Sequence, residues 1–295
     1  MLHIITDSAS DLPKDYIEQH KLHVIPTPVV IDDVDYFDGT TIQTEEFYHI
    51  LDDINRNIKT YHINPAMFTE AFLPYAKAGD SVIYLCFSTG IAGTFNAANI
   101  ALSNVREDYP GFDLTIIDSK CASAGFGLVV GKLVAMLEKG ASKEEIIDAA
   151  DYYISHIKHV FTVQTLAYLI KGGRLTKFKG TLAETLDMKP VLIVNETGAL
   201  SVVRSVRGRK KALRYLIEYA RANGCHPDND IIALCHGEDL DSLRFVDAMV
   251  QETFRPKRTV YAVVGCAIGA HTGRGIIGFC YFDADDGKFA DYFRD

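Results

Sequence analysis

Strand-sized and helix-sized apolar patterns alternate along the first half of the chain. Residues 2–8, 80–90 and 113–119 are short apolar runs that close in polar or glycine-bearing turns, and the run at 80–90 is typical of a strand buried on both faces. Residues 21–31 form another extended run, whose prolines suit the edge or end of a strand. Helical spacing lies between these runs, at 40–57, 65–79, 94–110, 123–140 and 142–159. The alternation predicts a parallel sheet covered by helices on both faces.

The pattern changes after about residue 160. Residues 191–204 join two β-rich runs through a polar turn that contains Gly198, which predicts a hairpin. Four further strand-like runs and two helical segments predict a mixed sheet with helices on one face. The strands are expected at 159–164, 229–237, 258–266 and 275–282, and the helices at 207–223 and 238–253. At 295 residues, two domains are expected. We therefore predict one domain at 1–160 and a second at 161–295, packed tightly together because no low-complexity linker separates them.

Composition places the chain among ordinary globular proteins, with 48% hydrophobic and 23% charged residues. No apolar run approaches the ~20 residues that a membrane helix needs, so no integral membrane association is expected. The first residues carry no signal-peptide pattern, which favours a cytoplasmic location. The cysteines are singletons without zinc or redox spacing and are interpreted as small buried residues of a reducing compartment: Cys86, Cys121, Cys225, Cys235, Cys266 and Cys280.

The net charge is −9, which disfavours nucleic-acid binding. Two basic clusters interrupt this acidic chain. The first, at 169–180, places Arg174 after two glycines, and the second, at 204–215, contains Arg207 and Arg209. A solvated surface is the usual explanation for such clusters. Their occurrence in the same half of an acidic chain also points to an acidic partner or a phosphate.

The segment 87–98 lies where a buried strand turns into a helix. A helix start exposes free N–H groups and the positive end of the dipole, and Ser88, Thr89 and Thr94 add hydroxyl donors. This turn therefore suits a phosphate or a carboxylate. An ordinary helix cap explains the same residues equally well.

In the segment 263–282, two apolar runs flank a glycine-rich stretch. Its "GRGIIG" matches G-x-G-x-x-G, but a β-like run follows it, whereas the dinucleotide fingerprint requires a helix. The glycines are explained by a sharp reversal between two buried strands. That explanation leaves His271 and Arg274 without a role.

Patterns for metals and for catalysis are missing from the sequence. The acidic run at 32–39 lacks EF-hand spacing, and the histidines show no zinc pattern. Neither a nucleophile elbow nor a P-loop occurs, and Cys121 is better explained as a structural thiol than as a nucleophile. The residues predict an anion site without catalytic residues, metal or cofactor.

Seven segments, in this order, resemble the DegV family: "TDSASDLP", "STGIAGTF", "IIDSKCASAGFG", "LIKGGRLTKFKG", "MKPVLIV", "RGRKKAL" and "GAHTGRG". The resemblance implies a three-layer α/β/α domain with a parallel sheet, followed by a two-layer α/β domain with a mixed sheet. It also implies a non-enzymatic protein that buries a long-chain fatty acid, expected here as C14–C18. Several such proteins are the acyl-carrying subunit of bacterial fatty acid kinase and present the carboxylate to a separate catalytic subunit.

The resemblance also implies which residues form the site. Thr60, His271 and the turn from Ser88 through Thr89 to Thr94 hold the carboxylate, and Asp7 falls near the opening between the domains. Arg174 lies on the surface used by the kinase, where we also expect Arg207 and Arg209. The acyl chain is expected to be lined by Phe126, Leu166, Leu169, Ile193, Ile268 and Ile276.

The chain departs from the family pattern at three places. After Thr60 it reads "YHIN" in place of S-Q-P-S, so Tyr61 and His62 are expected to reshape the pocket mouth. Ala92 replaces a serine that is a carboxylate donor, and Arg274 replaces a proline. We expect Arg274 to supply the missing hydrogen-bond donor. Alternatively, Arg274 alters the docking of a partner, or Ala92 is tolerated because Thr89 or Thr94 already donates to the carboxylate.

Two other functions remain as alternatives. A related fold occurs in dihydroxyacetone kinases, so the chain is alternatively a small-molecule phosphotransferase subunit, although no nucleotide motif is present. The third interpretation is a regulatory protein that senses fatty acid and binds another protein through its basic clusters.

Overall fold

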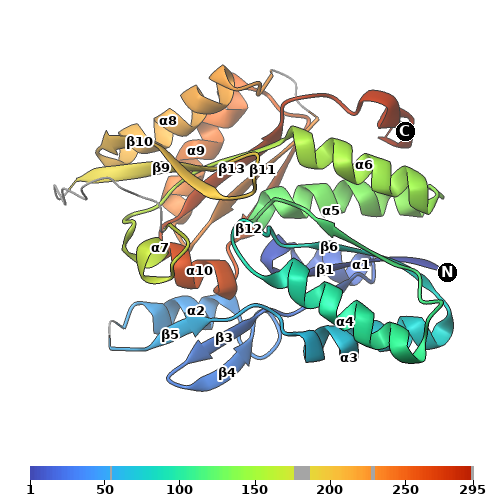
Figure 1. The fold of residues 1–295 in the computed structure, drawn as a ribbon. Coiled ribbons are helices and arrows are strands. Elements are labelled where there is room, and N and C mark those ends of the chain that lie inside the picture. The colour runs from blue at the N-terminus through green and yellow to red at the C-terminus, as the bar shows by residue number, and fades with distance from the viewer. Residues whose placement is uncertain (54, 176–186, 227–229, 294–295) are drawn as a thin grey trace.

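The computed structural model describes residues 1–295 except 54, 176–186, 227–229 and 294–295. The first half of the chain is built on a parallel sheet that includes β1 and β6 (Figure 1), and the strand pairings give the four-stranded order β2, β1, β6, β7. Its strands are β1 (Leu2–Asp7), β2 (His23–Ile25), β6 (Ser81–Cys86) and β7 (Leu114–Asp118). As the uninterrupted apolar run predicted, β6 is an interior strand and is buried from Val82 to Cys86.

Helices cover both faces of this sheet. One face packs against α3 (Pro65–Ala78) and α4 (Thr94–Asp108), whose phenylalanines and alanines form an apolar cluster with the strands. The other face packs against α5 (Ser123–Glu138), behind which lies α6 (Lys143–His156). The short helix α1 (Lys14–Gln19) follows the 3₁₀ turn η1 (Ser8–Ser10). This arrangement confirms the predicted three-layer α/β/α architecture.

The second half contains a six-stranded sheet in the order β10, β9, β8, β13, β11, β12, in which only β11 and β12 run parallel. Its strands are β8 (Ile157–Thr162), β9 (Met188–Val194), β10 (Leu200–Arg207), β11 (Ile231–His236), β12 (Arg258–Val263) and β13 (Ile277–Phe282). Helices α8 (Arg209–Ala222) and α9 (Leu240–Thr253) pack on one face. The predicted mixed sheet and the β9–β10 hairpin are confirmed.

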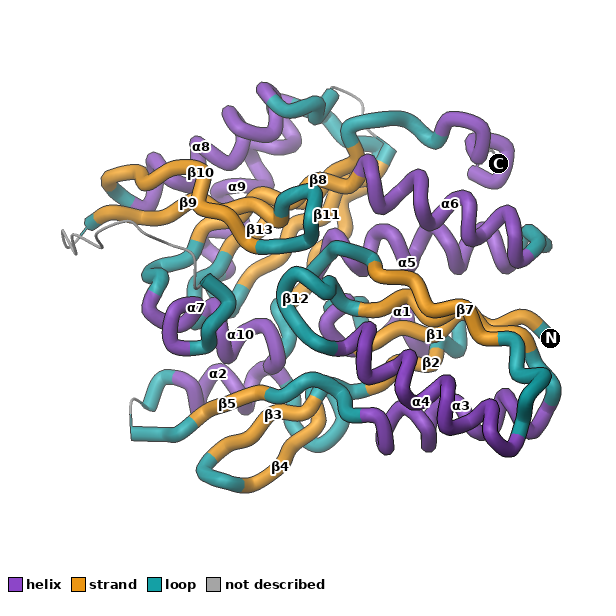
Figure 2. The backbone as a smooth tube through the Cα atoms, in the orientation of Figure 1, coloured by secondary structure: helices purple, strands orange, loops and turns teal. Residues whose placement is uncertain are grey.

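Helix α5 lies between the two sheets and contacts strands of both (Figure 2). Its residues Phe126, Val130 and Leu133 belong to one apolar cluster that also contains Ile83 of β6 and Phe161 of β8. Because β8 begins at Ile157, the six-stranded sheet starts just before residue 161. The division into 1–160 and 161–295 stays a prediction.

A small antiparallel sheet and α2 (Thr44–Leu51) form a further layer, whose strands are β3 (Pro28–Ile31), β4 (Val34–Phe37) and β5 (Ile58–Thr60). Helix α10 (Cys266–Thr272), from the far end of the chain, packs against this layer. The predicted helix at 40–57 is therefore shorter than expected, since its last residues lead into β5. The two remaining elements are α7 (Ala167–Lys171) and the 3₁₀ turn η2 (Gly287–Phe293).

The segment between β12 and β13 differs from the prediction of a sharp reversal between buried strands. Helix α10 separates the two strands, and β12 is the edge strand of its sheet, with Tyr261 46% and Val263 39% exposed. Gly273 and Gly275 end the helix and turn the chain toward β13, with φ of 75° and 84°. Among the described residues, no helix has the length and apolar character needed to cross a membrane.

Candidate functional site

A cavity lies between the two halves of the chain, and its wall includes α10. The space between its walls, with the open mouth included, is about 890 Å³. Most of the side chains on its wall are apolar and come from both sheets and their connections: Phe87, Ile91, Ala92, Val160, Phe161, Leu169, Val194, Leu200, Ala267, Ile268 and Ile276. The cavity therefore suits an apolar ligand.

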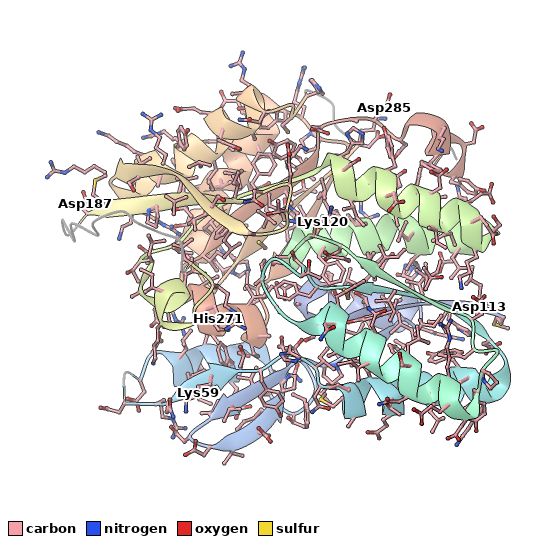
Figure 3. All side chains as sticks on the ribbon, viewed as in Figure 1. Lys59, Asp113, Lys120, Asp187, His271 and Asp285 are labelled. Atoms are coloured by element: carbon pink, nitrogen blue, oxygen red, sulfur yellow. The ribbon has the colours of Figure 1, made fainter. Side chains whose placement is uncertain are left out.

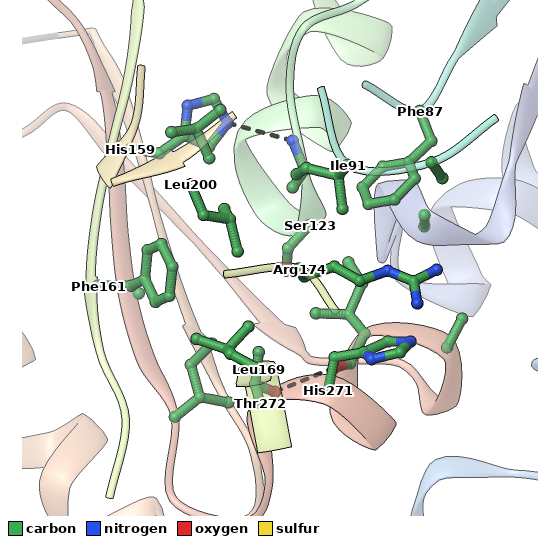
Figure 4. Close-up of a pocket in the computed structure, with 18 of the residues that line it drawn as sticks. Phe87, Ile91, Ser123, His159, Phe161, Leu169, Arg174, Leu200, His271 and Thr272 are labelled. Carbon is green, nitrogen blue, oxygen red and sulfur yellow. Dashed lines mark hydrogen bonds between the residues drawn. The ribbon is translucent and has the colours of Figure 1, made fainter. Parts of the chain in front are cut away.

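Polar side chains gather at one place on this wall. His271, on the last turn of α10, lies on the side of the helix that faces the layer of α2 and β5 (Figure 3). Its Nε2 is 2.6 Å from Oγ1 of Thr60, the last residue of β5. Arg174, which follows α7, lies next to His271, while His159 and Leu200 lie farther along the cavity (Figure 4). Three segments, β5, the residues after α7, and α10, thus place a hydroxyl, a guanidinium and an imidazole together.

His271 is uncharged at neutral pH. Burial, with a smaller contribution from the nearby Arg174 charge, lowers the pKa of His271 to about 4. A neutral imidazole carries one proton. If that proton is on Nε2, His271 donates to Thr60 and leaves the Thr60 hydroxyl proton free; if it is on Nδ1, the hydroxyl donates and the Nδ1–H is left free. In either case the described pair keeps one unused donor.

Arg174 supplies the positive charge at this end of the cavity. Burial lowers its pKa, but a guanidinium stays protonated at pH 7. Its Nη1 donates to the carbonyl oxygen of Gly172 at 2.6 Å, and no Asp or Glu is among the described residues of the wall. A partly buried cation without a facing carboxylate favours an anionic ligand group, because pairing offsets the cost of desolvating both charges.

Gly172 lets the chain after α7 approach His271 closely. A Cβ atom at this position would lie 2.0 Å from His271 Nδ1, a distance that real contacts do not allow. The Nδ1 atom is buried and has no hydrogen-bond partner among the described residues. Gly172, the first glycine of the pair before Arg174, thus has a steric role at the site, whereas Gly173 serves the turn with a φ of 73°.

Several predicted residues do lie on the cavity wall. Thr60, Thr94 and His271 line it, and so do Ala92 and the pair Tyr61 and His62 that departs from the family pattern. Of the residues expected to line an acyl chain, Leu169, Ile268 and Ile276 lie on the cavity wall. The other three expected residues, Phe126, Leu166 and Ile193, pack in or against the apolar clusters and are not on this wall. On β9, Val194 faces the cavity and its neighbour Ile193 faces α8, as the strand period of two requires.

Three residues predicted to hold a carboxylate do not reach the cavity wall, because other groups already pair with them. Ser88 is fully buried and donates to the carbonyl oxygen of Gly198 at 2.7 Å. Thr89 donates to Asp118 at 2.5 Å. Arg274 forms ion pairs with Asp52 at 3.0 Å and Glu238 at 2.8 Å, and so does not replace the donor missing at Ala92. The carboxylate-binding role of the predicted set stays a prediction.

The residues predicted for a partner surface lie in different environments. Arg174 is on the cavity wall, Arg207 is exposed on β10, and Arg209 is largely turned inward, where it donates to Asp239 and to the Gly275 carbonyl oxygen. Lys177 and Lys179 lie outside the described residues. The partner role of Arg174, Arg207 and Arg209 stays a prediction.

Asp7 does not lie at an opening. Its side chain is fully buried and accepts hydrogen bonds from Phe87 N at 2.9 Å and the Tyr84 hydroxyl at 2.8 Å. Burial raises its pKa to about 6. Asp7 therefore holds the end of β6 in place and does not face a ligand.

The sequence reasoning missed polar residues deeper in the cavity. His159 and Ser123 line it, and Ser123 begins α5 with a left-handed φ of 51°. Burial lowers the pKa of His159 to about 4, so this imidazole is also neutral at pH 7. Because strand residues alternate between faces, the sequence could have placed His159 on the same face of β8 as Phe161. No sequence pattern indicated that Ser123 would line the cavity. Among the described residues, no group of three or more His, Cys, Asp or Glu side chains is arranged to hold a metal ion.

The chain is similar to known proteins in both sequence and fold. A family model described as the DegV family matches residues 1–284. A DegV domain-containing protein of Caldanaerobacter subterraneus subsp. tengcongensis is 34% identical over 270 residues, which cover 92% of this chain and 94% of that protein.

Two similar solved structures are described as fatty-acid-binding proteins. One, a stearic-acid-binding protein from Eubacterium ventriosum, is 29% identical with a TM-score of 0.86, over 96% of this chain and 98% of that one. The other, a DegV family protein from Thermus thermophilus, is 26% identical with a TM-score of 0.84, over 95% and 99% of the two chains.

Proposed function

The chain belongs to the DegV family, and from this premise we propose that it binds a long-chain fatty acid of C14–C18. The acyl chain occupies the cavity between the two sheets, and the carboxylate lies beside Thr60, Arg174 and His271. One observation carries the proposal: an apolar cavity reaches a guanidinium, a hydroxyl and a neutral imidazole, with no carboxylate among the described residues of its wall. The fatty-acid-binding structures from Eubacterium ventriosum and Thermus thermophilus support it.

The physical chemistry of the cavity favours a long chain. Each buried methylene contributes about 0.8 kcal/mol, so a C16 chain gains roughly 12 kcal/mol before the cost of association. Association and ordering remove several kcal/mol or more of this gain. A short acid would retain the polar contacts but lose most of the apolar gain. We therefore expect tight binding only for long chains.

The polar residues have separate roles in this proposal. Arg174 neutralises the carboxylate, and the Thr60–His271 pair donates the hydrogen bond that its internal contact leaves unused. Since His271 is neutral at pH 7, the ion pair with Arg174 provides the electrostatic part of binding. Thr94, buried at the start of α4, lines the same cavity and offers a further hydroxyl.

The test is extraction of the purified protein followed by mass spectrometry, then titration of the delipidated protein with palmitate. We expect a C14–C18 fatty acid at about one per chain. Arg174→Ala and His271→Ala should each weaken palmitate binding at least tenfold, because a hydrogen bond to a charged group is worth about 1.5–3 kcal/mol. A protein that is empty on purification, and stays empty with palmitate and oleate, contradicts the proposal.

A finer part of the proposal concerns the fate of the ligand. We infer that the protein presents the carboxylate to a separate fatty acid kinase subunit for acyl-phosphate formation, and is itself non-catalytic. The family resemblance supports this, as does the exposed Arg207 on β10. Arg207→Ala should leave palmitate binding unchanged and slow phosphorylation by a kinase subunit from the same cell. Equal rates for the variant and the original protein would remove Arg207 from the partner surface.

A further inference from the structure

Helix α10 begins on two carboxylates from the first half of the chain. Gly265 caps the helix without a side chain, so its first N–H groups need partners from elsewhere. Asp38, which follows β4, accepts from Cys266 N at 2.9 Å and from Ala267 N at 3.1 Å. Asp11, which follows η1, accepts from Gly265 N at 2.9 Å. Residues more than 220 positions away in sequence thus provide the N-terminal capping of the helix that carries His271.

These contacts are enclosed and specific. Asp38 is 4% exposed and Asp11 8%, and a Cβ at residue 265 would lie 2.7 Å from Asp11 and 2.9 Å from Asp38. Only glycine lets both carboxylates approach this closely. Ser8 supports Asp38 by donating at 3.3 Å to Oδ2, the oxygen that also accepts from Ala267 N. Because carboxylates of the protein accept the hydrogen bonds of the first amides, the arrangement fixes the position of the helix start.

The other end of α10 is held by the site itself. His271 contacts Thr60 of β5, in the small sheet whose strand β4 leads into Asp38. A helix of seven residues is about 10 Å long, so its two ends move together. Tyr48 of α2 donates to the Val264 carbonyl oxygen at 3.1 Å, just before the helix. A displacement of the helix start would therefore be transmitted to the imidazole.

Electrostatics favour the same arrangement. The N–H groups at the start of a helix attract negative charge, and two N–H donors on one carboxylate offset much of its desolvation. Burial still raises the pKa of Asp38, and it raises that of Asp11 further. Among the residues whose contacts are described, no Lys or Arg pairs with either group. Their partners are the α10 amides and the hydroxyls of Ser8 and Ser123.

We propose that Asp38 is a positioning residue for the ligand carboxylate: by accepting from the first amides of α10, it sets His271 against Thr60 beside Arg174. The inference rests on the proposed function, since it concerns recognition of the fatty-acid head group. Asp38 does not touch the ligand, because it does not line the cavity. Its effect should therefore appear in head-group recognition and not in the apolar part of binding.

The test compares two ligands that share one chain. Delipidated protein and Asp38→Asn are titrated with palmitic acid and with 1-hexadecanol, which lacks the carboxylate. Asparagine keeps the size but offers one acceptor oxygen in place of two. We expect palmitate affinity to fall about five- to tenfold, because one of the two α10 amides loses its acceptor, and hexadecanol affinity to change less than twofold. Asp33→Asn is the control, because Asp33 is exposed and its left-handed φ of 65° suits asparagine.

The pKa of His271, followed by NMR of its imidazole, gives a second measurement. In Asp38→Asn it should rise from about 4 toward the ordinary value as the ring leaves its buried contact. Ser8→Ala, which removes the supporting hydroxyl, should produce the same changes to a smaller degree and decides the matter if Asp38→Asn does not fold. If palmitate and hexadecanol weaken equally, or if neither changes, the positioning role is overturned while fatty-acid binding stands. If the original protein fails to bind palmitate, the proposed function falls first.

Discussion

At the scale of single residues, Gly172 shows how one missing methyl group shapes the site. A Cβ there would lie 2.0 Å from His271 Nδ1, so Gly172→Ala must push the imidazole away from Thr60 or displace the end of α7. We expect palmitate affinity to fall by about tenfold, the cost of one hydrogen bond to a charged group. Calorimetric titration of the delipidated variant measures this.

Gly111→Ala is the matched control for this substitution. A Cβ at residue 111 meets nothing within 4 Å, and its φ is not left-handed, so neither affinity nor folding should change. If Gly172→Ala binds palmitate as the control does, His271 does not contribute to head-group binding in the way described.

The same scale shows which site residues the sequence could identify. Thr60 and His271 were predicted through the family motifs, and the structure brings them within 2.6 Å of each other. The turn at 88–94 was predicted as a unit, but the directions of its hydroxyls depend on distant partners. Ser88 turns to Gly198 and Thr89 to Asp118, which leaves Thr94 on the wall. The local sequence shows that three hydroxyl side chains lie in this turn. Which of them faces the cavity depends on the partners that the fold brings to the other two.

At the scale of elements, prediction succeeded where the apolar period is local and long. The interior strand β6 and the hairpin of β9 and β10 have such patterns. Helix α10 was missed because it has seven residues, and its Gly269 masks the helical pattern. That glycine is explained by packing, since a Cβ there would lie 2.9 Å from the Tyr48 hydroxyl of α2. Tertiary contacts, absent from a single sequence, outweighed local propensity here.

The contact of α5 with the second sheet leads to a prediction about stability. Gly125 lies on the face of α5 toward β8, where a Cβ would lie 2.2 Å from His159 Nε2. We expect Gly125→Ala to lower the free energy of unfolding by about 1–3 kcal/mol, as overpacking in a close-packed core does. Urea unfolding of the two proteins, followed by circular dichroism, measures the difference.

Gly131, on the same helix, provides the internal control. Its Cβ would meet the Tyr16 hydroxyl at 3.7 Å, an ordinary contact. Gly131→Ala should therefore raise the stability by up to about 1 kcal/mol, because alanine has the higher helix propensity. Equal effects of the two substitutions would mean that α5 does not approach β8 as closely as the structure describes.

At the scale of the whole molecule, the cavity is part of the contact between the two halves. Ile91 and Ala92 come from the first half, and Phe161, Val194 and Leu200 from the second, around the apolar cluster that α5 shares with both sheets. A ligand in this space contacts both halves at once. The energy of binding should therefore also stabilise the association of the halves, so that they unfold together.

Thermal unfolding tests this link between ligand and fold. A ligand at 100 times its Kd stabilises the folded state by about 2.7 kcal/mol. For a chain of this size we expect palmitate to raise the Tm of the delipidated protein by about 5 °C or more, in a single transition. His271→Ala should show a smaller rise at the same palmitate concentration, because part of the affinity is lost while the apolar wall is unchanged. Two separate transitions, with only one of them moved by palmitate, would show that the ligand lies within one half and not between them.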